Sequence, residues 1–475
     1  MRPQPGPGRG GERALVVGLG VTGRAVARAL GDRGYSVTAV DDSNAEAMVL
    51  QSHAAELGIH LECSPDESVL AAMASQADLV VLSPGVPPNH PVLRHAPPGR
   101  TIAEIELAWR LSDVPIAAIT GTNGKTTVTS LAASMLAASG VTAVAAGNIG
   151  PPLIGVVIDP PAGLEVVVVE VSSFQLMWTS GFRPRVACWL NLSEDHLDWH
   201  RDMAEYAGAK GRIWQNQGSD DLAVANAEDP VVLAASHRAK SRLETFGLAA
   251  GDYHEEAGRL LAPDGTVLLH SAELPRSLPH DRANALAAAA VALGAGATID
   301  GCAAALRAGV PLPHRIELVG EGDGLTYYDD SKATTPAAVC AALAGFESVV
   351  LIAGGRNKGL DLSVIAAFLR REREEEQAPG PARPRAVVAI GEAAGEVTAA
   401  FAGMCPVVQA ASMAEAVSAA ASLGRDGDAV LLSPGCASFD WYGSYVERGH
   451  DFSNNVRELL RLEPAGSSAS RQEAP

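Results

Sequence analysis

The chain has 475 residues, of which 47% are hydrophobic and 19% charged, and its formal net charge is −19. A length of about 150 residues per domain predicts about three domains, and no apolar run is long enough to cross a bilayer. The negative charge, without any Lys/Arg stripe, argues against binding to a nucleic-acid backbone. We therefore expect a globular, cytoplasmic protein that binds neither nucleic acid nor membranes.

Both ends of the chain have the composition of disordered tails. Residues 1–12 are rich in Pro, Gly and Arg and precede no apolar segment, which is unlike a secretory signal. Residues 463–475 are mostly small and polar. The six cysteines have no paired metal-ligand spacing, so we expect reduced thiols and neither a disulfide nor a zinc site.

In the first unit, residues 13–111, short aliphatic runs alternate with helical segments, which is the pattern of a parallel α/β sheet. The sequence GLGVTG, residues 18–23, follows a predicted strand and precedes a helix, and Asp41 ends the next strand. These features meet the dinucleotide-binding fingerprint. A nicotinamide dehydrogenase is therefore one hypothesis, although the same loop can bind another diphosphate. The turn SPG, residues 83–85, follows a further strand and is by itself only a turn.

The second unit, residues 112–312, contains AITGTNGKTT, residues 118–127. An apolar run precedes this segment and an Ala-rich run of helical spacing follows it, which predicts a strand, a loop of exposed amides and a helix. Such a loop holds phosphate, with Lys125 reaching the terminal phosphates and the Thr126 hydroxyl placed for magnesium. The usual loop has a Gly where this chain has Ile119, so the match is to a shorter variant. The alternative is an ordinary glycine turn; the favoured ligand is ATP.

Carboxylates and histidines follow the next apolar strands. Glu170 ends the run EVVVVE, where a carboxylate can hold magnesium beside a phosphate loop; the alternative is a solvated residue at a strand edge. The later segment EDHLDWH also has residues that a zinc cluster would use. Because magnesium takes only one or two protein ligands, we choose His196 and expect Asp198 and His200 to lie in a polar loop.

The third unit, residues 313–462, again alternates strands and helical segments, which indicates a third α/β sheet. The charged segment at residues 371–385 predicts an exposed helix end and a variable loop, and we assign it no function. Lys210, taken alone, has the sequence context of an ordinary solvated helical lysine.

The order of motifs resembles the Mur ligase family from about residue 13 to residue 462. The motifs are GTNGKTT, GNIG, VEVSSFQL, NLSEDHLD, a Lys twelve residues beyond Asp198, RANALAA, LPHRIE, DDSKAT and LLSPGCASFD. The combination of GLGVTG, SPG and GTNGKTT is most similar to the branch of the family that uses D-glutamate. The resemblance implies a monomer with a Rossmann-like N-terminal domain, a central P-loop-type ATPase domain and a Rossmann-like C-terminal domain.

The resemblance also implies a reaction. ATP would phosphorylate the carboxylate of UDP-N-acetylmuramoyl-L-alanine, and the amine of D-glutamate would attack the acyl phosphate. A carboxylate is a poor electrophile, so phosphorylation supplies the leaving group while the protein positions anions and neutralises charge. Two magnesium ions and a carbamylated Lys210, which would be an anionic metal ligand, are implied as well.

Site residues transfer from the family by their motifs. Those implied in catalysis are Lys125, Glu170, His196 and Lys210, and the implied magnesium ligands are Thr126, Glu170, His196 and Lys210. The implied ATP contacts are Gly121, Thr122, Asn123, Gly124, Lys125, Thr126, Thr127, Asn284, His314, Arg315 and Asp330. The implied contacts to the UDP substrate are Gly18, Gly20, Thr22, Gly23, Asp41, Ser83, Pro84, Gly85, Asn148, Ser172 and Gln175. The implied D-glutamate contacts are Lys332, Thr334, Lys358, Ser438 and Phe439.

Other functions remain open at this point. A dehydrogenase would leave Lys125 and Glu170 without a role, and a noncatalytic binder of UDP-sugars would tolerate the loss of Lys210. A sister ligase with another amino-acid acceptor would share the ATP machinery. Sisters that use L-alanine typically have His in place of Asn123, which favours D-glutamate. Ser43 departs from some relatives, which leaves the uridine contact open. Phe439 and Tyr445 also depart from some relatives, which leaves the shape of the acceptor pocket open.

Overall fold

The computed structural model describes residues 11–43, 47–197, 199–310, 312–371 and 383–462. The expected tails and most of the charged segment at 371–385 lie outside these residues. The chain divides into two compact units: unit 1 contains the residues up to 192 together with 199–310, and unit 2 contains 193–198 and the residues from 311. No helix that the structure describes combines the length and the hydropathy of a membrane span.

Unit 1 begins with a five-stranded parallel sheet of order β3-β2-β1-β4-β5. Its strands are β1 (Arg13–Val17), β2 (Ser36–Asp41), β3 (His60–Cys63), β4 (Leu79–Leu82) and β5 (Thr101–Ala103). Its helices are α1 (Val21–Gly31), α2 (Ala47–Leu57), α3 (Glu67–Gln76), α4 (Val92–His95) and α5 (Glu104–Leu111). In the inner strands, β1 is apolar and buried after Arg13 and β4 is so throughout, which is the pattern of strands covered by helices on both faces.

A second, six-stranded parallel sheet of order β11-β10-β9-β6-β8-β7 also belongs to unit 1. Its strands are β6 (Ile116–Thr120), β7 (Ala143–Gly147), β8 (Val166–Glu170), β9 (Val186–Trp189), β10 (Leu222–Asn226) and β11 (Arg242–Phe246). Its helices are α6 (Lys125–Ala138), α7 (Leu153–Ile158), α8 (Ser173–Met177), α9 (Met203–Gly211), η1 (Arg212–Trp214), α10 (Pro230–Ser236), α11 (Pro279–Gly294) and α12 (Ile299–Ala308). The buried alanines of α11 let this helix pack closely in the core.

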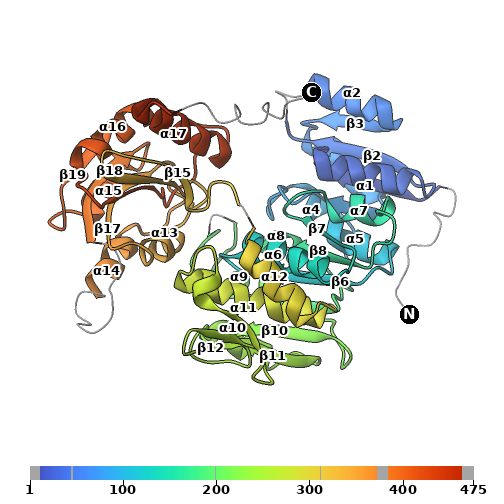
Figure 1. Ribbon diagram of the computed structural model, residues 1–475. Helices are drawn as coiled ribbons and strands as arrows, with labels where there is room; N and C mark the ends of the chain where they lie inside the picture. Colours follow the sequence, from blue (N-terminus) through green and yellow to red (C-terminus); the bar gives the residue numbers. More distant parts are fainter. Residues whose placement is uncertain (1–10, 44–46, 198, 311, 372–382, 463–475) are drawn as a thin grey trace, which may run out of the picture. The chain divides into compact units, whose positions relative to one another are not determined.

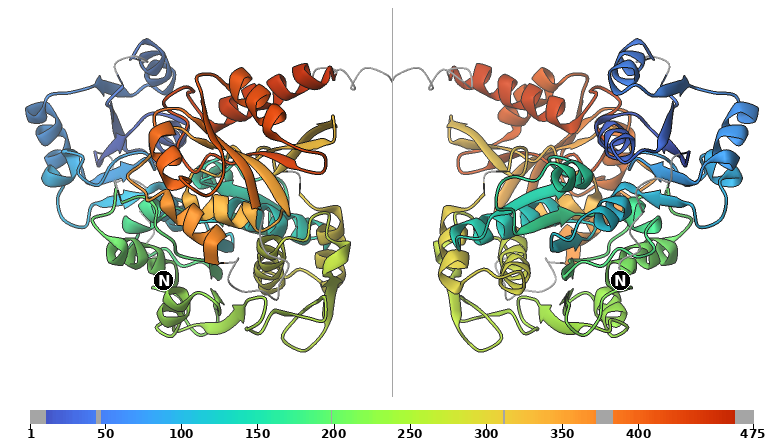
Figure 2. Two further views of the ribbon diagram at one scale, coloured as in Figure 1. Left: turned by 90° about the vertical axis from the view of Figure 1, so that its left-hand side faces the viewer. Right: turned by 90° about the vertical axis from the view of Figure 1, so that its right-hand side faces the viewer.

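One part of unit 1 was not expected from the sequence. A small antiparallel sheet is formed by β12 (His254–Glu256), β13 (Arg259–Leu261) and β14 (Val267–His270), followed by η2 (Ser271–Glu273). These strands have three or four residues each, too few to show a two-residue alternation. They lie at the end of unit 1 opposite α2 (Figures 1 and 2).

Unit 2 contains a six-stranded sheet of order β15-β16-β20-β17-β18-β19. Its strands are β15 (Glu317–Gly322), β16 (Leu325–Asp329), β17 (Ser348–Gly354), β18 (Arg383–Ile390), β19 (Val407–Ala410) and β20 (Ala429–Leu432). Its helices are α13 (Pro336–Leu343), α14 (Ser363–Arg371), α15 (Ala394–Ala400), α16 (Met413–Leu423) and α17 (Tyr445–Leu460). Helices α16 and α17 cover one face and α13 and α14 the other (Figures 1 and 2). All pairs are parallel except β15 with β16, so the α/β expectation is confirmed.

Candidate active site

The loop between β6 and α6 has the strand–loop–helix geometry expected from the sequence. β6 ends at Thr120 and α6 begins at Lys125. Gly124 has a φ of 83°, and a Cβ at this position would lie 2.6 Å from Oδ1 of Asn284. Only glycine fits this turn without strain. The close approach also brings Asn284, a predicted ATP contact on α11, against the loop.

Asn191 holds the loop in place. Its Oδ1 accepts hydrogen bonds from the backbone N–H groups of Thr122 (3.0 Å) and Asn123 (2.9 Å), and its Nδ2 donates to the Asn123 carbonyl (3.1 Å). Asn191 is not among the site residues predicted from the sequence. Its place just after β9, the neighbour of β6, was the available signal, because ligands gather at the carboxyl ends of parallel strands.

Lys125 lies over its own loop. Its Nζ donates to the carbonyls of Gly121 and Thr122, each at 2.9 Å. An ammonium group at the start of a helix can move from these carbonyls to a terminal phosphate, which is the chemistry expected of a phosphate loop.

Glu170 connects two predicted site residues. Its Oε2 accepts from the Thr126 hydroxyl at 2.8 Å, and its Oε1 accepts from Nδ2 of Asn148 at 2.9 Å. The residue is only 2% exposed, so the alternative of a solvated strand edge is wrong. A hydroxyl and a carboxylate beside a phosphate loop are oxygen ligands of the kind that magnesium prefers, and Thr126 and Glu170 therefore fit such an ion.

Lys210 is buried, not solvated as its local sequence suggests. It is 1% exposed, and its Nζ donates to the Gly121 carbonyl at 2.7 Å. The same Nζ lies 4.6 Å from the ring centroid of Tyr206, whose hydroxyl is 3.2 Å from Oγ1 of Thr122. Lys210 and Tyr206 therefore lie against the phosphate loop, and Tyr206 is a second residue that the sequence analysis missed.

Two predicted contacts to the UDP substrate form a helix cap. The Ser172 hydroxyl accepts from the Gln175 backbone N–H at 3.2 Å, and Oε1 of Gln175 accepts from the Ser172 N–H at 3.0 Å. This capping box begins α8. Nearby, Nε2 of His200 lies 2.9 Å from Oγ of Ser173. His200 is buried within its loop, whereas Asp198 is outside the described residues.

The loops after β1 and β4 meet at the point where the order of the N-terminal sheet reverses. The Ser83 hydroxyl donates to the Gly18 carbonyl at 2.9 Å, and a Cβ on Gly23 would lie 1.8 Å from the same carbonyl oxygen. Oδ2 of Asp41 accepts from the Leu19 backbone N–H at 2.7 Å. These contacts bring the two predicted nucleotide loops of this sheet together, and they form a ligand-binding edge of the usual kind. Thr22 lies in the first turn of α1, while Pro84 and Gly85 continue the second loop.

In unit 2, His314 forms a buried pair with Asp329. Nδ1 of His314 lies 2.7 Å from Oδ2 of Asp329, and the hydrogen bond to this carboxylate raises the pKa of His314. Oδ2 of the adjacent Asp330 accepts from the Ser433 hydroxyl at 2.8 Å. Arg315 follows His314 directly and Asp330 follows Asp329, so the predicted ATP contacts of this unit lie on two segments that the pair joins.

Arg448 joins two loops of unit 2, and the sequence analysis missed it. The guanidinium donates to Oγ (3.0 Å) and the carbonyl (2.8 Å) of Ser331, and to the carbonyl of Cys436 (3.1 Å). Burial lowers its pKa to about 10. Ser331 precedes Lys332, and Cys436 lies two residues before Ser438, so Arg448 fixes the backbone beside two predicted D-glutamate contacts.

The other predicted D-glutamate contacts differ in their surroundings. Nζ of Lys332 lies 3.7 Å from the ring centroid of Tyr445, and Nζ of Lys358 lies 3.7 Å from Oδ1 of Asp195. Ser438 is buried, whereas Phe439 is 61% exposed. Thr334 is half-buried.

His196 belongs to the segment 193–198, which groups with unit 2. Its backbone N–H donates to Oδ1 of Asp195 at 2.9 Å, and its φ is 57°. Thr126, Glu170 and Lys210 belong to unit 1, where contacts of the phosphate loop hold all three.

Three family models match the chain in succession. They are the Mur ligase MurD-like N-terminal domain (residues 12–101), the Mur ligase middle domain (119–292) and the Mur ligase glutamate ligase domain (314–436). The chain belongs to the Mur ligase family. As a Mur ligase it is an ATP- and Mg²⁺-dependent ligase of peptidoglycan synthesis, and the dehydrogenase alternative is wrong.

Named relatives agree with this membership. The chain is 44% identical over 461 residues to a UDP-N-acetylmuramoylalanine–D-glutamate ligase of Desulfosudis oleivorans, covering 94% of this chain and 96% of that one. It is 40% identical to the enzyme of the same name from Trichlorobacter lovleyi, covering 94% and 99%. Among solved structures, a pseudomurein peptide ligase type C from Methanothermus fervidus matches with a TM-score of 0.60 at 19% identity, covering 94% and 100%. That likeness shows the shared fold.

Proposed function

We propose that this Mur ligase joins D-glutamate to UDP-N-acetylmuramoyl-L-alanine and couples the new amide bond to the cleavage of ATP to ADP and phosphate. The observation that carries the proposal is the connected set Lys125, Thr126, Glu170 and Asn148 at the head of one phosphate loop. It combines a cation for phosphate, a ligand pair for magnesium and an amide for the sugar substrate.

The reaction has two steps. A carboxylate oxygen of the UDP substrate attacks the γ-phosphorus of ATP, the bond to the β-phosphate oxygen breaks, and ADP leaves. The amine of D-glutamate then attacks the acyl carbon, the carbon–oxygen bond to phosphate breaks, and the nitrogen loses a proton as the amide forms. Lys125 binds the transferred phosphoryl group. The N–H groups of Thr122 and Asn123 are bonded to Asn191, so the N–H groups of the first turn of α6 orient the phosphoryl group. Magnesium, when bound, neutralises the charge that develops on the phosphoryl oxygens.

The proposal gives Lys210 a modified side chain. The neutral amine of Lys210 adds to the carbon of carbon dioxide. A nitrogen–carbon bond forms, the electron pair of one carbon–oxygen π bond moves to oxygen, and the nitrogen releases one proton to give a carbamate. The product is an anion beside the phosphate loop, and with His196 and Glu170 it would complete a site for two magnesium ions. The burial of Lys210 and its contact with the Gly121 carbonyl support this role, because ordinary lysines keep their ammonium in water.

The remaining site residues divide by substrate. We assign ATP to Gly121, Thr122, Asn123, Gly124, Thr127, Asn284, His314, Arg315 and Asp330. We assign the UDP substrate to Gly18, Gly20, Thr22, Gly23, Asp41, Ser83, Pro84, Gly85, Asn148, Ser172 and Gln175. We assign D-glutamate to Lys332, Thr334, Lys358, Ser438 and Phe439, because two carboxylates are bound best by lysines and hydroxyls. We also propose that the domains span residues 13–111, 112–312 and 313–462, and that the protein acts as a monomer in the cytoplasm.

Phosphate release tests the acceptor. Purified protein is mixed with ATP, magnesium, UDP-N-acetylmuramoyl-L-alanine and one amino acid: D-glutamate, L-glutamate, D-aspartate or L-alanine. The proposal predicts release with D-glutamate alone. Release with another amino acid only would keep the ligase mechanism and reject the acceptor, and silence with every acceptor would reject both.

A further inference from the structure

Helix α5 is the joint between the two parallel sheets of unit 1. It follows β5 directly, and the backbone N–H of Ala103 donates to the carbonyl of Trp178 at 2.8 Å. Oε1 of Glu104, the first residue of the helix, accepts from the Ile154 N–H at 2.6 Å. Ile154 lies in α7 and Trp178 follows α8. The end of the N-terminal sheet is therefore bonded to two segments of the central sheet.

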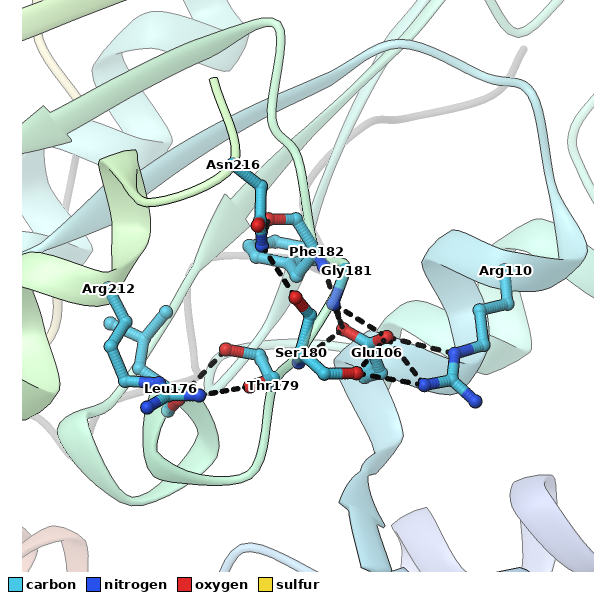
Figure 3. Close-up of polar contacts among 9 residues, drawn as sticks. All are labelled: Glu106, Arg110, Leu176, Thr179, Ser180, Gly181, Phe182, Arg212 and Asn216. Atoms are coloured by element: carbon cyan, nitrogen blue, oxygen red, sulfur yellow. Dashed lines mark hydrogen bonds and ion pairs between the residues drawn. The ribbon is translucent and has the colours of Figure 1, made fainter. Parts of the chain in front are cut away.

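Glu106, also on α5, makes a further connection to the central sheet and is 0% exposed. Its carboxylate accepts from the backbone N–H groups of Ser180 (3.1 Å), Gly181 (3.0 Å) and Phe182 (2.7 Å). The Ser180 hydroxyl and Nε of Arg110 donate to it as well, at 3.1 and 2.8 Å (Figure 3). All five groups are donors, so both carboxylate oxygens must act as acceptors.

The loop at 180–182 lies tightly on the helix. A Cβ on Gly181 would lie 2.7 Å from Cζ3 of Trp109 and 3.2 Å from Oε1 of Glu106. Figure 3 shows the three successive residues Ser180, Gly181 and Phe182 around the carboxylate, with Arg110 on the other side. Such close packing fixes the loop in one position.

The segment held in this way is part of the proposed active site. It begins at Glu170, continues through the α8 cap at Ser172 and Gln175, and ends in the loop that Glu106 holds. Glu104 acts in the same way on α7, the helix that follows the loop of Asn148. Glu104 therefore fixes the α7 end of the segment that carries Asn148, and Glu106 fixes the end at 180–182 of the segment that carries Glu170.

We propose that Glu106 is a positioning residue that sets the spacing between the two halves of the UDP-substrate site. The inference rests on the proposed function, in which the nucleotide of the substrate binds the loops after β1 and β4 and the rest of the substrate reaches Asn148, Ser172 and Gln175. A substrate that contacts both sheets binds well only when the sheets are held at the matching separation. The phosphate loop of ATP belongs to the central sheet alone and does not depend on that separation.

A purely structural role makes a different prediction. Loss of the Glu106 contacts would then lower the thermal stability, and the folded enzyme would keep its KM values. The ratio of the KM for the UDP substrate to the KM for ATP separates these cases. A general loss of folded protein lowers the apparent kcat but leaves both KM values unchanged.

The test uses Glu106→Gln in the full chain. Its amide NH₂ would face backbone N–H donors, so hydrogen bonds between α5 and the loop at 180–182 are lost. We expect the KM for UDP-N-acetylmuramoyl-L-alanine to rise about tenfold, with the KM for ATP within about twofold. Thermal unfolding of the same samples confirms that each variant is folded.

Two further variants make the test decisive. Glu228→Gln removes an exposed carboxylate that accepts from the Ala249 N–H at 2.6 Å within the central domain, and it should leave both KM values unchanged. Ser180→Ala removes the hydroxyl contacts to Glu106 and Arg110 but keeps the backbone hydrogen bonds. It should raise the KM for the UDP substrate slightly and leave the KM for ATP unchanged. If Glu106→Gln does not fold, the KM ratio of Ser180→Ala is the test of the inference. A KM ratio in folded Glu106→Gln equal to that of wild type would overturn the inference. An inactive wild-type enzyme would instead refute the proposed function.

Discussion

The hydroxyl of Thr126 donates a hydrogen bond to Oε2 of Glu170 over 2.8 Å, although the two residues are 44 positions apart in the chain. Thr126 is in the first turn of α6 and Glu170 ends β8, the strand that pairs with β6. The parallel pairing brings the phosphate loop and the carboxylate to one edge of the sheet. A magnesium ion bound at this edge would have the Thr126 hydroxyl oxygen and a Glu170 carboxylate oxygen as its protein ligands.

This pair predicts the behaviour of a matched set of substitutions. Thr126→Ala and Glu170→Ala each remove one oxygen, and each should lower kcat by roughly 100- to 1000-fold, the usual cost of losing one electrostatic group. Thr126→Ser keeps the hydroxyl and should stay within about tenfold of wild type. Steady-state ADP formation measures all three. Equal rates for Thr126→Ala and Thr126→Ser would show that the hydroxyl has no catalytic role.

Lys210→Ala tests the carbamate. The substitution removes the buried amine that donates to the Gly121 carbonyl, and with it the proposed anionic metal ligand. Turnover should fall at least about 100-fold, while the dissociation constant of the UDP substrate, measured by calorimetry without ATP, should stay within about twofold. An unchanged turnover rate would contradict the carbamate role of Lys210.

Glu104 predicts a pH-dependent stability. Burial raises its pKa from 4.5 to about 7, against the opposing effect of the hydrogen bond from the Ile154 N–H. The native state keeps a proton that the unfolded chain has lost, so the stability falls as the pH rises from about 4.5 to 7 and is lowest above that range. Glu104→Gln cannot ionise and can still accept the Ile154 bond.

Chemical denaturation at several pH values checks this expectation. Above pH 7, Glu104→Gln should be more stable than wild type by up to about 3 kcal/mol, and the difference should vanish near pH 4.5. Glu165→Gln, which alters an exposed carboxylate bonded to the Thr142 N–H, is the control. A difference between Glu104→Gln and wild type that does not vary with pH would contradict the burial argument.

Arg448→Met tests the join between two loops of unit 2. The substitution keeps the apolar packing but leaves the carbonyls of Ser331 and Cys436 without their donor, at a cost of about 1–3 kcal/mol. The KM for D-glutamate should rise by about tenfold, because Lys332 and Ser438 lose their fixed backbone. Arg457→Met, on the same helix, is the matched control and should leave that KM unchanged. A shift of equal size in the control would show a general effect on α17.

The local patterns predicted the parts of the site that lie close together in sequence. The loop at 121–124, the strand ending at Glu170 and the glycine loop after β1 each follow from an apolar run joined to a turn and a helix, and the structure has them there. Such signals depend only on neighbours along the chain, which is why sequence alone suffices.

The residues that were missed act through partners distant in sequence. Asn191 binds Asn123 across 68 positions, Glu106 binds Phe182 across 76, and Arg448 binds Ser331 across 117. Of the three, only Asn191 has a local signal, its place just after an apolar strand. Nothing near Glu106 or Arg448 distinguishes these side chains from solvated polar residues before the fold is known. Lys210 shows the same limit, since its burial arises from packing against Gly121 and Tyr206.

The most direct test of the proposed chemistry follows the oxygen atoms. UDP-N-acetylmuramoyl-L-alanine labelled with ¹⁸O in both oxygens of its carboxylate is converted with ATP and D-glutamate, and the released phosphate is analysed by mass spectrometry. Attack of the carboxylate on the γ-phosphorus predicts that every phosphate released by the ligation carries an ¹⁸O atom from the substrate. Phosphate without ¹⁸O, formed together with the amide product, would contradict the acyl phosphate and with it the role assigned to Lys125, Thr126 and Glu170.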